Sequence, residues 1–508
     1  MTLSRVLTIT VACLLCLGIA STAPAQSRGG TVRIMLTVDA EGGIDPHKRI
    51  TSNAEVMDDQ MYDTLIEYET TSDQFKPALA ESWQASADGR TYTFRLRRGV
   101  RFHNGRELVS ADVKYSFERI LNPATASPRR LTFSPIERID TPDPRTVVFA
   151  LKGAYAPFLA NLAHITSAIV PREAVEQHGD LTRTAVGTGA FRLKEWEKDN
   201  FMRLERNPNY WRSGLPYLDG LEFRFNADRN AQVAALRSGQ INFLRNIDPA
   251  FVRTVRMSDQ FQVIGGQSNT YAYLYMNTNR RPFNDVRVRQ AINWAMDLDA
   301  IRRNAVLGFG VSLKSGILPA EHWGGIKEPV YPKQDLDRAR ALLSEAGVRG
   351  GTFNITVVTI TPANVRAAET IQQQLQPLGI NIEVRVLEPA PMLRAAFAAD
   401  FDMLILHGNF GIDPDDHFSQ VFLTGAGSNW IKYSDAELDA MIERARLGTS
   451  RADRARAYRD IVRRLATQGP RAGLYIVPEF HAFPSSLRGF KFEPSPSFRS
   501  LREAWFAQ

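Results

Sequence analysis

The chain has 508 residues, of which 44% are hydrophobic and 23% are charged, and its formal net charge is +7. This length allows two or more domains with large cores, and the composition is that of a globular protein rather than a disordered chain or a membrane protein. Basic and acidic residues are interspersed without a long basic run, so the charge pattern indicates a solvated surface and argues against a nucleic-acid partner.

The first 25 residues predict a cleaved secretory signal peptide. Arg5 supplies a positive charge, residues 6–19 are apolar, and residues 23–25 place small side chains at the cleavage site. The apolar run is shorter than the roughly 20 residues that span a bilayer. The only two cysteines, Cys13 and Cys16, lie in this segment and do not fit a lipobox. We therefore expect export without a lipid anchor, and a mature chain without thiol chemistry.

The next elements alternate between strands and helices. Residues 31–38 predict a strand that runs into the loop at Glu41, and residues 52–68 have helical spacing. An Asp-Gly turn precedes the alternating strand 91–96, and Ser110 caps a helix. His103 has no partner at metal-ligand spacing, so we expect a structural role for it.

Residues 187–211 predict a β-hairpin. Gly187 and Gly189 allow close approach of another group, strand-like segments follow at 191–196 and 201–204, and Asn207-Pro208-Asn209 marks a turn.

The second half of the chain contains a βαβ unit. Strand 271–277 precedes helix 286–296, and strand 354–359, helix 364–378 and strand 380–387 follow one another with short connections, which predicts parallel pairing. Residues 403–406 predict a buried strand, residues 453–467 a helix, and residues 474–477 a last strand before the chain returns to its first half.

Several separated segments resemble one protein family. The segments are LAESW at 79–83, YTFRLRRGVRFHNG at 92–105, ADV at 111–113, GTGAF at 187–191 and RNPNYW at 206–211. They resemble the large extracytoplasmic substrate-binding proteins of ABC importers, in the peptide/nickel class. The resemblance covers essentially the whole mature chain.

The resemblance implies an α/β fold, namely the two-lobed periplasmic-binding-protein fold (type II) with an extra inserted domain. On this basis we expect residues 26–50, 187–268 and 480–508 to form lobe I, residues 51–186 the insertion, and residues 269–479 lobe II. It also implies a periplasmic monomer that needs no cofactor. Such a protein captures a small ligand, a peptide or peptide-like compound, between its lobes and delivers it to a membrane permease.

The polar segment 407–417 follows a predicted buried strand, and three interpretations of it compete. Its two histidines are ten residues apart and no calcium-loop spacing is present, which argues against a metal site. Its carboxylates have no nucleophile partner for catalysis. A loop at the carboxyl end of such a strand commonly contacts ligand.

The family implies a role for this loop, because peptide-binding members carry Gly-Trp-x-x-Asp here, with the aspartate bound to the peptide amino group. In this chain Gly408 matches the glycine of the pattern, and Asn409 stands in place of the tryptophan. Asp413 lies five residues after Gly408, whereas the pattern has its aspartate four residues after the glycine. Asp413 therefore either pairs with a ligand amine or only forms a turn. Modified peptides, opines, other amide-bearing molecules and sugars remain alternative ligands.

The remaining candidate binding residues are Phe410, His407, Trp430, Tyr273, Asn277, Gly189 and Glu41.

Two other functions remain as alternatives. A secreted α/β hydrolase would need a nucleophile with its base, and the sequence contains no Gly-x-Ser-x-Gly, His-Glu-x-x-His, phosphate-loop or dinucleotide motif. A peptide receptor or chaperone without transport would share the binding site and differ only in its partner.

Overall fold

The computed structural model describes residues 26–40, 42–48, 52–70, 72–358, 361–409, 411–448, 450–495 and 497–507. The predicted signal peptide, Glu41 and Phe410 lie outside these residues. One mixed sheet runs along the molecule in the order β15-β14-β16-β12-β17-β11-β1-β10-β9-β8, with β13 added beside β17. Its strands are β1 (Thr31–Leu36), β8 (Phe191–Glu197), β9 (Phe201–Arg206), β10 (Gly220–Phe225), β11 (Phe243–Leu244), β12 (Phe261–Met276), β13 (Val311–Ser312), β14 (Gly351–Val358), β15 (Ile380–Leu387), β16 (Met403–Asn409) and β17 (Arg471–Pro484).

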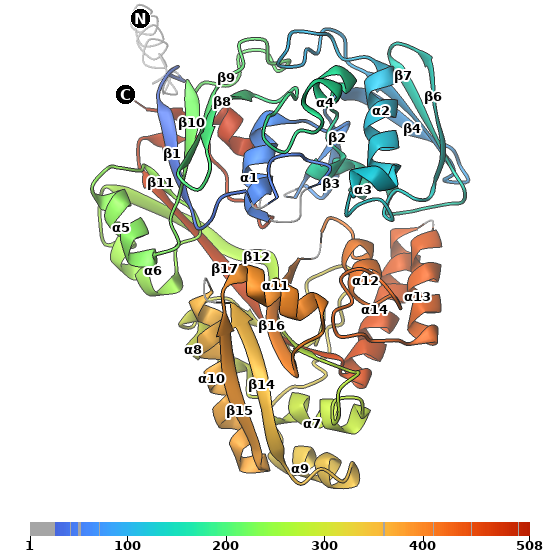
Figure 1. Cartoon of the computed structure of the whole chain (residues 1–508), viewed down its shortest axis with the longest axis vertical. Coiled ribbons are helices and arrows are strands. Elements are labelled where there is room, and N and C mark those ends of the chain that lie inside the picture. Colours follow the sequence, from blue (N-terminus) through green and yellow to red (C-terminus); the bar gives the residue numbers. More distant parts are fainter. Residues whose placement is uncertain are drawn as a thin grey trace, which may run out of the picture.

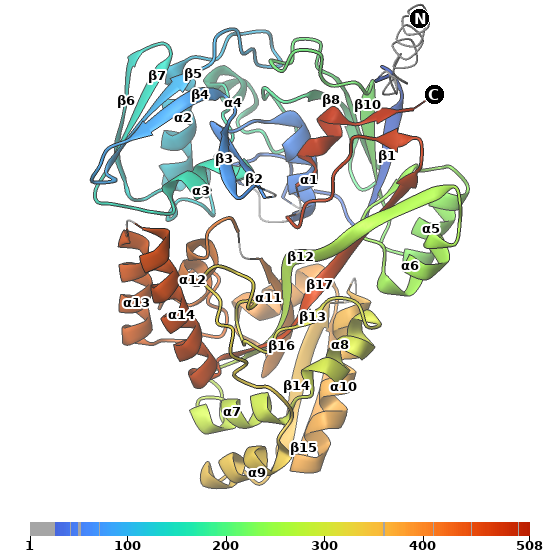
Figure 2. The ribbon, with the colours of Figure 1, turned by 180° about the vertical axis from the view of Figure 1, so that it is seen from behind.

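Two long antiparallel strands, β12 and β17, connect the two ends of this sheet (Figures 1 and 2). At one end, which we call the first lobe, β17 pairs with β11, and β1 pairs in parallel with β10 and β11. At the other end, the second lobe, β12 pairs with β16, and β14 pairs in parallel with β15 and β16. The register of β12 against β17 shifts between Gln267 and Tyr271, which marks the crossing point between the lobes.

The predicted βαβ unit of the second lobe is confirmed. Helix α10 (Pro362–Leu375) connects β14 to β15, and these strands pair in parallel from Gly351↔Ile380 to Val358↔Leu387. Proline at the first helical position suits the helix start, and Ala367, Ala368, Ile371 and Leu375 form its buried face. The other second-lobe helices are α7 (Val286–Ala295), α8 (Leu298–Val306), α9 (Leu336–Glu345), α11 (Pro389–Phe397), α12 (Asp415–Val421), α13 (Ala436–Leu447) and α14 (Arg451–Gln468).

The first lobe carries fewer helices. They are α1 (Ser52–Met61), α5 (Arg229–Arg237), α6 (Pro249–Arg256) and the 3-10 helix η4 (Arg499–Glu503), and the short pair β18 (Leu487–Arg488) and β19 (Trp505–Phe506) lies near the C-terminus. None of the helices in the described part of the chain is long and apolar enough to span a membrane.

A separate four-stranded sheet lies beside the first lobe and above helices α12–α14 (Figures 1 and 2). Its core consists of buried residues between Leu65 and Ile169, and we call this part the subdomain. Its elements are β2 (Ile66–Glu69), β3 (Gln74–Pro77), β4 (Ala80–Ala85), β5 (Thr91–Leu96), α2 (Ser110–Leu121), η1 (Pro123–Thr125), β6 (Ile136–Asp143), β7 (Thr146–Leu151), α3 (Phe158–Ala163) and η2 (Ile165–Ser167), and α4 (Arg172–His178) follows it. Helix α1 and residues of α4 pack into the first-lobe core. The division of the chain into domains at residues 51 and 186 remains a prediction.

The helix expected at residues 52–68 is shorter in the structure. It ends at Met61, and residues 66–69 form strand β2, paired with β3. Asp63 lies between them and accepts hydrogen bonds from Thr188 Oγ1 (2.9 Å) and Trp211 Nε1 (2.9 Å). These distant contacts, together with burial of Leu65 and Ile66 in the subdomain core, outweigh the local helical spacing.

The hairpin at residues 187–211 forms as β8 and β9, and its glycines pack against the end of α1. A Cβ built on Gly187 would lie 2.1 Å from the Met61 carbonyl oxygen, and one on Gly189 would lie 2.4 Å from the Met61 carbonyl carbon. The close approach predicted from these glycines therefore involves the protein backbone.

His103 contacts both of these glycines. Its Nε2 lies 3.1 Å from the Gly189 oxygen, and its Nδ1 accepts a hydrogen bond from the Gly187 N–H. Burial lowers the pKa of His103 to about 4. The arrangement fits a neutral, structural histidine.

We expect Gly189→Ala to destabilise the protein by about 1–3 kcal/mol, because the added methyl group requires the backbones of two elements to separate. The matched control is Gly427→Ala, since a Cβ there would meet nothing within 4 Å. Urea unfolding followed by tryptophan fluorescence measures both variants. Equal midpoints for the two variants would contradict the packing role of Gly189.

Candidate functional site

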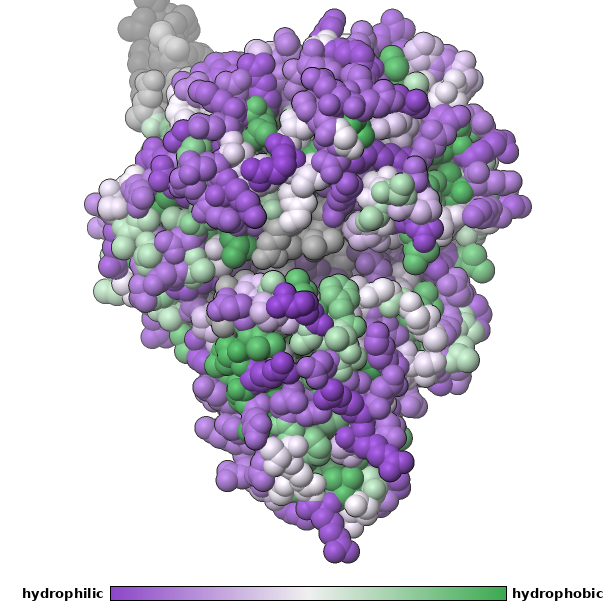
Figure 3. Space-filling view, viewed as in Figure 1, coloured by the Kyte–Doolittle hydropathy of each residue, from purple (hydrophilic) through white to green (hydrophobic). Residues whose placement is uncertain are grey.

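Three cavities line the interface between the lobes, and two of them meet at Asn409. Figure 3 shows the molecule hollowed between its two lobes. Strand β16 ends at Asn409, beside the crossing strand β12, where Thr270 is its pairing partner. The carboxyl end of this strand therefore projects into the interface, as expected for a ligand site in an α/β sheet.

The first cavity, which we call the hinge chamber, has a volume of about 340 Å³ and lies at the crossing strands. Neutral polar side chains contribute much of its wall, from both lobes and from the crossing strands: Thr37, Asn53, Asn246, Ser268, Thr270, Thr361, His407 and Asn409. Its charged side chains are Arg229, Arg245, Asp248 and Glu479. Such a surface suits a ligand with several hydrogen-bonding groups.

The second cavity, the central chamber, has a volume of about 390 Å³ and is richer in carboxylates. Its acidic side chains outnumber its two arginines, Arg451 and Arg499. They are Glu55, Asp73, Glu321, Asp416 and Glu493. Asp73 pairs with Arg451 and Asp416 with Arg129, whereas burial raises the pKa of Glu493. The lining of this chamber is therefore acidic by its residue types, although two of its carboxylates are paired with arginines of the protein.

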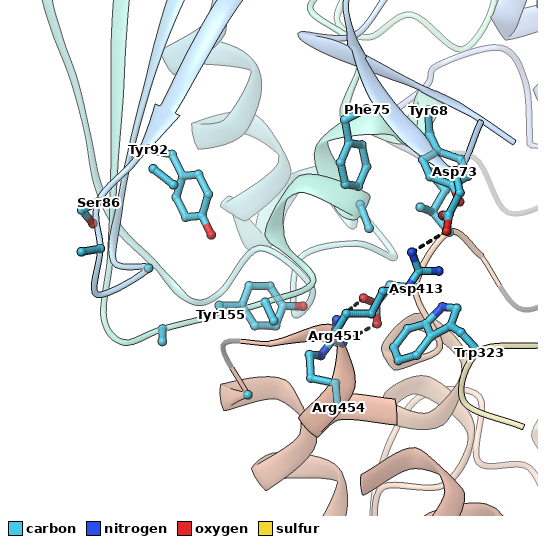
Figure 4. Close-up of a pocket in the computed structure, with 18 residues that line it drawn as sticks. Tyr68, Asp73, Phe75, Ser86, Tyr92, Tyr155, Trp323, Asp413, Arg451 and Arg454 are labelled. Atoms are coloured by element: carbon cyan, nitrogen blue, oxygen red, sulfur yellow. Dashed lines mark hydrogen bonds and ion pairs between the residues drawn. The ribbon is translucent and has the colours of Figure 1, made fainter. Parts of the chain in front are cut away.

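The third cavity, the side chamber, lies between the subdomain and the second lobe and has a volume of about 390 Å³ (Figure 4). Aromatic rings from both parts contribute to its wall, namely Tyr68, Phe75, Tyr92, Tyr155 and Trp323. It shares Tyr68, Asp73, Trp323, Ile412 and Arg451 with the central chamber. The side chamber is therefore an extension of the interface with aromatic and charged walls.

Two of the predicted site residues, Asn409 and His407, line the hinge chamber. Asn409 is exposed and lines both the hinge chamber and the central chamber. His407 lines the hinge chamber, its Nε2 lies 2.9 Å from Asn364 Oδ1, and burial lowers its pKa to about 4. His407 is therefore neutral at physiological pH and acts as a hydrogen-bonding group.

Asp413 lies in the wall of the side chamber, where the structure gives its carboxylate an internal partner. Arg454 Nη1 donates to Oδ2 (2.5 Å) and Nη2 donates to Oδ1 (2.6 Å), a bidentate pair visible in Figure 4. Although burial lowers the pKa of Arg454, the hydrogen bonds and charge of Asp413 raise it above its usual value. Asp413 also accepts from the Asp415 N–H (3.0 Å), as a turn residue does.

Four other predicted site residues, Tyr273, Asn277, Trp430 and Gly189, line none of the three cavities. Tyr273 is fully buried, donates to the Ile317 oxygen (2.7 Å) and stacks on Arg471. Asn277 Nδ2 donates to the oxygens of Ala399 (2.9 Å) and Phe401 (3.0 Å). Trp430 packs against Tyr275 and Phe397. A ligand-binding role for these four residues remains a prediction. Their contacts within the protein favour a structural role instead.

The sequence analysis missed lining residues in every part of the molecule, including the subdomain, the second lobe, the first lobe and the C-terminal segment. Arg245 and Asn246 directly follow β11, Asn53 begins α1, and Glu493 and Arg499 precede the C-terminus. One local signal exists, because polar residues that follow a strand of an α/β sheet commonly line its ligand site. The resemblance assigns residues 480–508 to lobe I, but no local pattern identifies Glu493 or Arg499 as residues that line the cleft.

In the described ranges, no group of three or more His, Cys, Asp or Glu side chains is placed to hold a metal ion.

Known proteins resemble this chain over nearly its full length. The family model of bacterial extracellular solute-binding proteins, family 5, matches residues 74–430. Di/tripeptide-binding protein 2 of Pseudomonas aeruginosa (strain UCBPP-PA14) is 31% identical, over 95% of this chain and 96% of its own. Among solved structures, the periplasmic binding protein DppA from Helicobacter pylori in complex with the peptide STSA has a TM-score of 0.87 at 26% identity, over 95% of this chain and 99% of its own. AgaA from A. tumefaciens R10 in complex with agropinic acid has a TM-score of 0.85 at 24% identity, over 94% and 99%, and that likeness shows the fold.

Proposed function

Because this chain belongs to the bacterial extracellular solute-binding proteins of family 5, we propose that it captures a peptide or peptide-like compound between its lobes and delivers it to a membrane permease of an ABC importer. The family match and the structural neighbours confirm the predicted α/β, two-lobed periplasmic-binding-protein fold. The proposed site of action is the periplasm, with the protein working as a monomer. The relatives are solute-binding proteins, which favours binding over the alternative of a secreted hydrolase.

One observation carries the peptide proposal, namely the different charge character of the two chambers that meet at Asn409. The hinge chamber contains two arginines balanced by two carboxylates, and the central chamber contains five carboxylates and two arginines. A short peptide has a cationic end and an anionic end, so it can satisfy both chambers at once. The neutral polar side chains of the hinge chamber suit its amide groups.

The experiment is a thermal unfolding assay on residues 26–508 with di- and tripeptides of alanine and leucine, an opine, an oligosaccharide and Ni²⁺. We expect a peptide to raise the unfolding midpoint, because a ligand at 100 times its dissociation constant adds about 2.7 kcal/mol of stability. Recovery of the intact peptide afterwards separates binding from hydrolysis. A panel in which no peptide stabilises the protein, or in which a peptide is cleaved, would contradict the proposal. Peptide uptake by cells with and without the protein separates transport from a receptor role.

A further inference from the structure

A buried carboxyl group, that of Asp415, lies where the subdomain meets the second lobe. Asp415 begins α12, and its side chain is 2% exposed. From the subdomain, the Tyr155 hydroxyl donates to its Oδ2 (3.4 Å), and the neighbouring Ala156 N–H donates to the oxygen of Arg446 (3.0 Å). The guanidinium carbon of Arg446 also lies 5.4 Å from the centre of the Tyr155 ring. The subdomain therefore covers part of the surroundings of this carboxyl group.

This cover is removed when the lobes separate. Strands β12 and β17 pair in both lobes and connect them. The subdomain is joined to the first lobe by a mostly buried ion pair, in which Arg502 of η4 donates to both oxygens of Glu67 in β2 (2.7 and 2.8 Å). Helix α12 belongs to the second lobe. Opening at the crossing strands therefore carries Tyr155 away from Asp415 and admits water to its carboxyl group.

Two other carboxylates lie in the same segment, and each has an arginine of its own. Arg454 pairs with Asp413, and Arg129 of the subdomain pairs with Asp416. Figure 4 shows Asp413 and Arg454 on the second lobe, facing the subdomain. These arginines are engaged by the neighbouring aspartates, so their guanidinium groups are directed to carboxylates other than that of Asp415.

Arg446 on α13 is the cation that contacts Asp415, and the contact is poor. Its Nε lies 3.2 Å from Oδ1, but neither atom makes a hydrogen bond in the described part of the chain. Its Nη1 donates instead to Glu443 (2.8 Å). A carboxylate that is buried with so few hydrogen bonds is unstable relative to the neutral acid.

The direction of the pKa agrees with this geometry. The titratable and charged groups around Asp415 are Asp413, Asp416, Arg446 on α13, Arg454 and Tyr458 on α14, and Tyr155 and Arg129 in the subdomain. Burial raises the pKa of Asp415 to about 7. The charges of its two acidic neighbours act in the same direction, and those of Arg446 and Arg454 oppose them.

We propose that closure of the lobes takes up one proton from solvent at the Asp415 carboxylate, so that ligand binding is linked to proton binding and strengthens as the pH falls. The proton leaves again when the lobes open and water reaches the carboxyl group. This inference rests on the proposed function and adds to it a device by which external pH adjusts affinity.

The pH range follows from the two states of Asp415. With water around it in the open form, its pKa lies near the usual value of about 4. In the closed form the pKa is raised, so the contribution of Asp415 to closure is fully present below about pH 4 and is lost as the pH rises through about 7. Between pH 7.0 and pH 5.5 these two values give an increase in affinity of about 15-fold.

The test is isothermal titration calorimetry on residues 26–508 with trialanine and trileucine, whose termini ionise outside this pH range. We expect the wild-type protein to bind about 15-fold more tightly at pH 5.5 than at pH 7.0. At pH 5.5, titrations in acetate and in MES, buffers of different ionisation enthalpy, should show uptake of close to one proton. This second measurement needs no variant, so it does not depend on how a substituted protein folds.

Asp415→Asn imitates the protonated carboxyl group and cannot titrate. It should bind equally at both pH values, without proton uptake, and at pH 7.0 it should bind at least about tenfold more tightly than the wild type. A residue with only a structural role would not strengthen binding when it is replaced. Asp337→Asn is the matched control, since Asp337 on α9 is 96% exposed, and it should keep the proton uptake of the wild type.

The outcomes separate this inference from the proposed function. If neither peptide binds at either pH, the proposed function fails and the inference fails with it. If peptides bind without proton uptake, or if Asp415→Asn still takes up a proton, the inference is wrong while the proposed function stands. In the last case the proton belongs to another group, such as Glu493 or Glu479, which line the chambers and whose pKa values burial also raises.

Discussion

Asp413→Asn is expected to lower the free energy of unfolding by about 3–5 kcal/mol, although the two side chains have the same shape. In the wild-type protein both Asp413 and Arg454 are more than nine-tenths buried, and two hydrogen bonds join them (Figure 4). Asparagine removes the negative charge and leaves the guanidinium desolvated without a counter-charge. Breaking one side of a buried ion pair costs much more than the intact pair contributes, because the remaining charge stays buried.

Asp415 provides a matched control two residues along the chain. It is also buried, but burial raises its pKa to about 7, well above the usual value near 4. Its folded-state pKa is raised, so its contribution to stability is present below about pH 4 and is lost as the pH rises towards 7. At pH 6 the side chain is mostly neutral, and Asp415→Asn should change the free energy of unfolding little. Arg446 Nε lies 3.2 Å from Asp415 Oδ1, but it makes no bidentate hydrogen bonds to this carboxyl group. The two variants, compared by urea unfolding at pH 6, therefore separate a bidentate buried ion pair from a carboxyl group that burial keeps mostly protonated beside an arginine.

Replacing both partners of the ion pair tests the explanation. Asp413→Asn combined with Arg454→Met removes the unpaired cation, so much of the lost stability should return.

The single variant Asp413→Asn also decides between the two interpretations that the sequence leaves open for Asp413, a partner of the ligand amine or a turn residue. If the variant keeps its stability but loses affinity for peptides with a free amino group, Asp413 is a ligand residue and the ion pair is incidental.

Local patterns predicted much of the fold and little of the binding cleft. The hairpin at residues 187–211 and the parallel unit of β14, α10 and β15 depend on turn residues and periodicity within a short segment. In contrast, Asp413 meets a partner 41 residues away, on a helix whose rotation is set by packing. The hinge chamber combines residues that follow β11, begin α1 and begin α10. No local pattern specifies that these three segments meet.

The structure also shows contacts that exist only while the subdomain and the second lobe are together. Arg129 in the subdomain pairs with Asp416 in the first turn of α12, and their side chains are 11% and 19% exposed. Close by, the Ala156 N–H donates to the Arg446 oxygen (3.0 Å), and the Tyr155 hydroxyl donates to Asp415 Oδ2 (3.4 Å). A second ion pair, Arg451 with Asp73, is about half exposed and therefore weaker. These contacts stabilise the closed arrangement without ligand.

Arg129→Gln is therefore expected to weaken peptide binding by about 10- to 150-fold while leaving the unfolding of each lobe nearly unchanged. A mostly buried hydrogen bond between charged groups contributes about 1.5–3 kcal/mol, and here it contributes to closure. When the open form predominates without ligand, the apparent dissociation constant rises by the factor by which the closed population falls. Small-angle X-ray scattering should show the variant more expanded than the wild type at the same peptide concentration.

A double-mutant cycle on the dissociation constant isolates this pair. Asp416→Asn should weaken binding as Arg129→Gln does, and the double variant should be little worse than either, because the second substitution removes a contact that is already lost. The control cycle uses Arg463 and Asp460, an exposed pair within α14 that does not cross between the lobes and should leave binding unchanged. An unchanged dissociation constant in Arg129→Gln, accompanied by a lower unfolding midpoint, would show that the pair stabilises the fold and not the closed state. A raised constant with an unchanged midpoint would mean that ligand affinity depends on a contact between the subdomain and the second lobe as well as on direct contacts with the ligand.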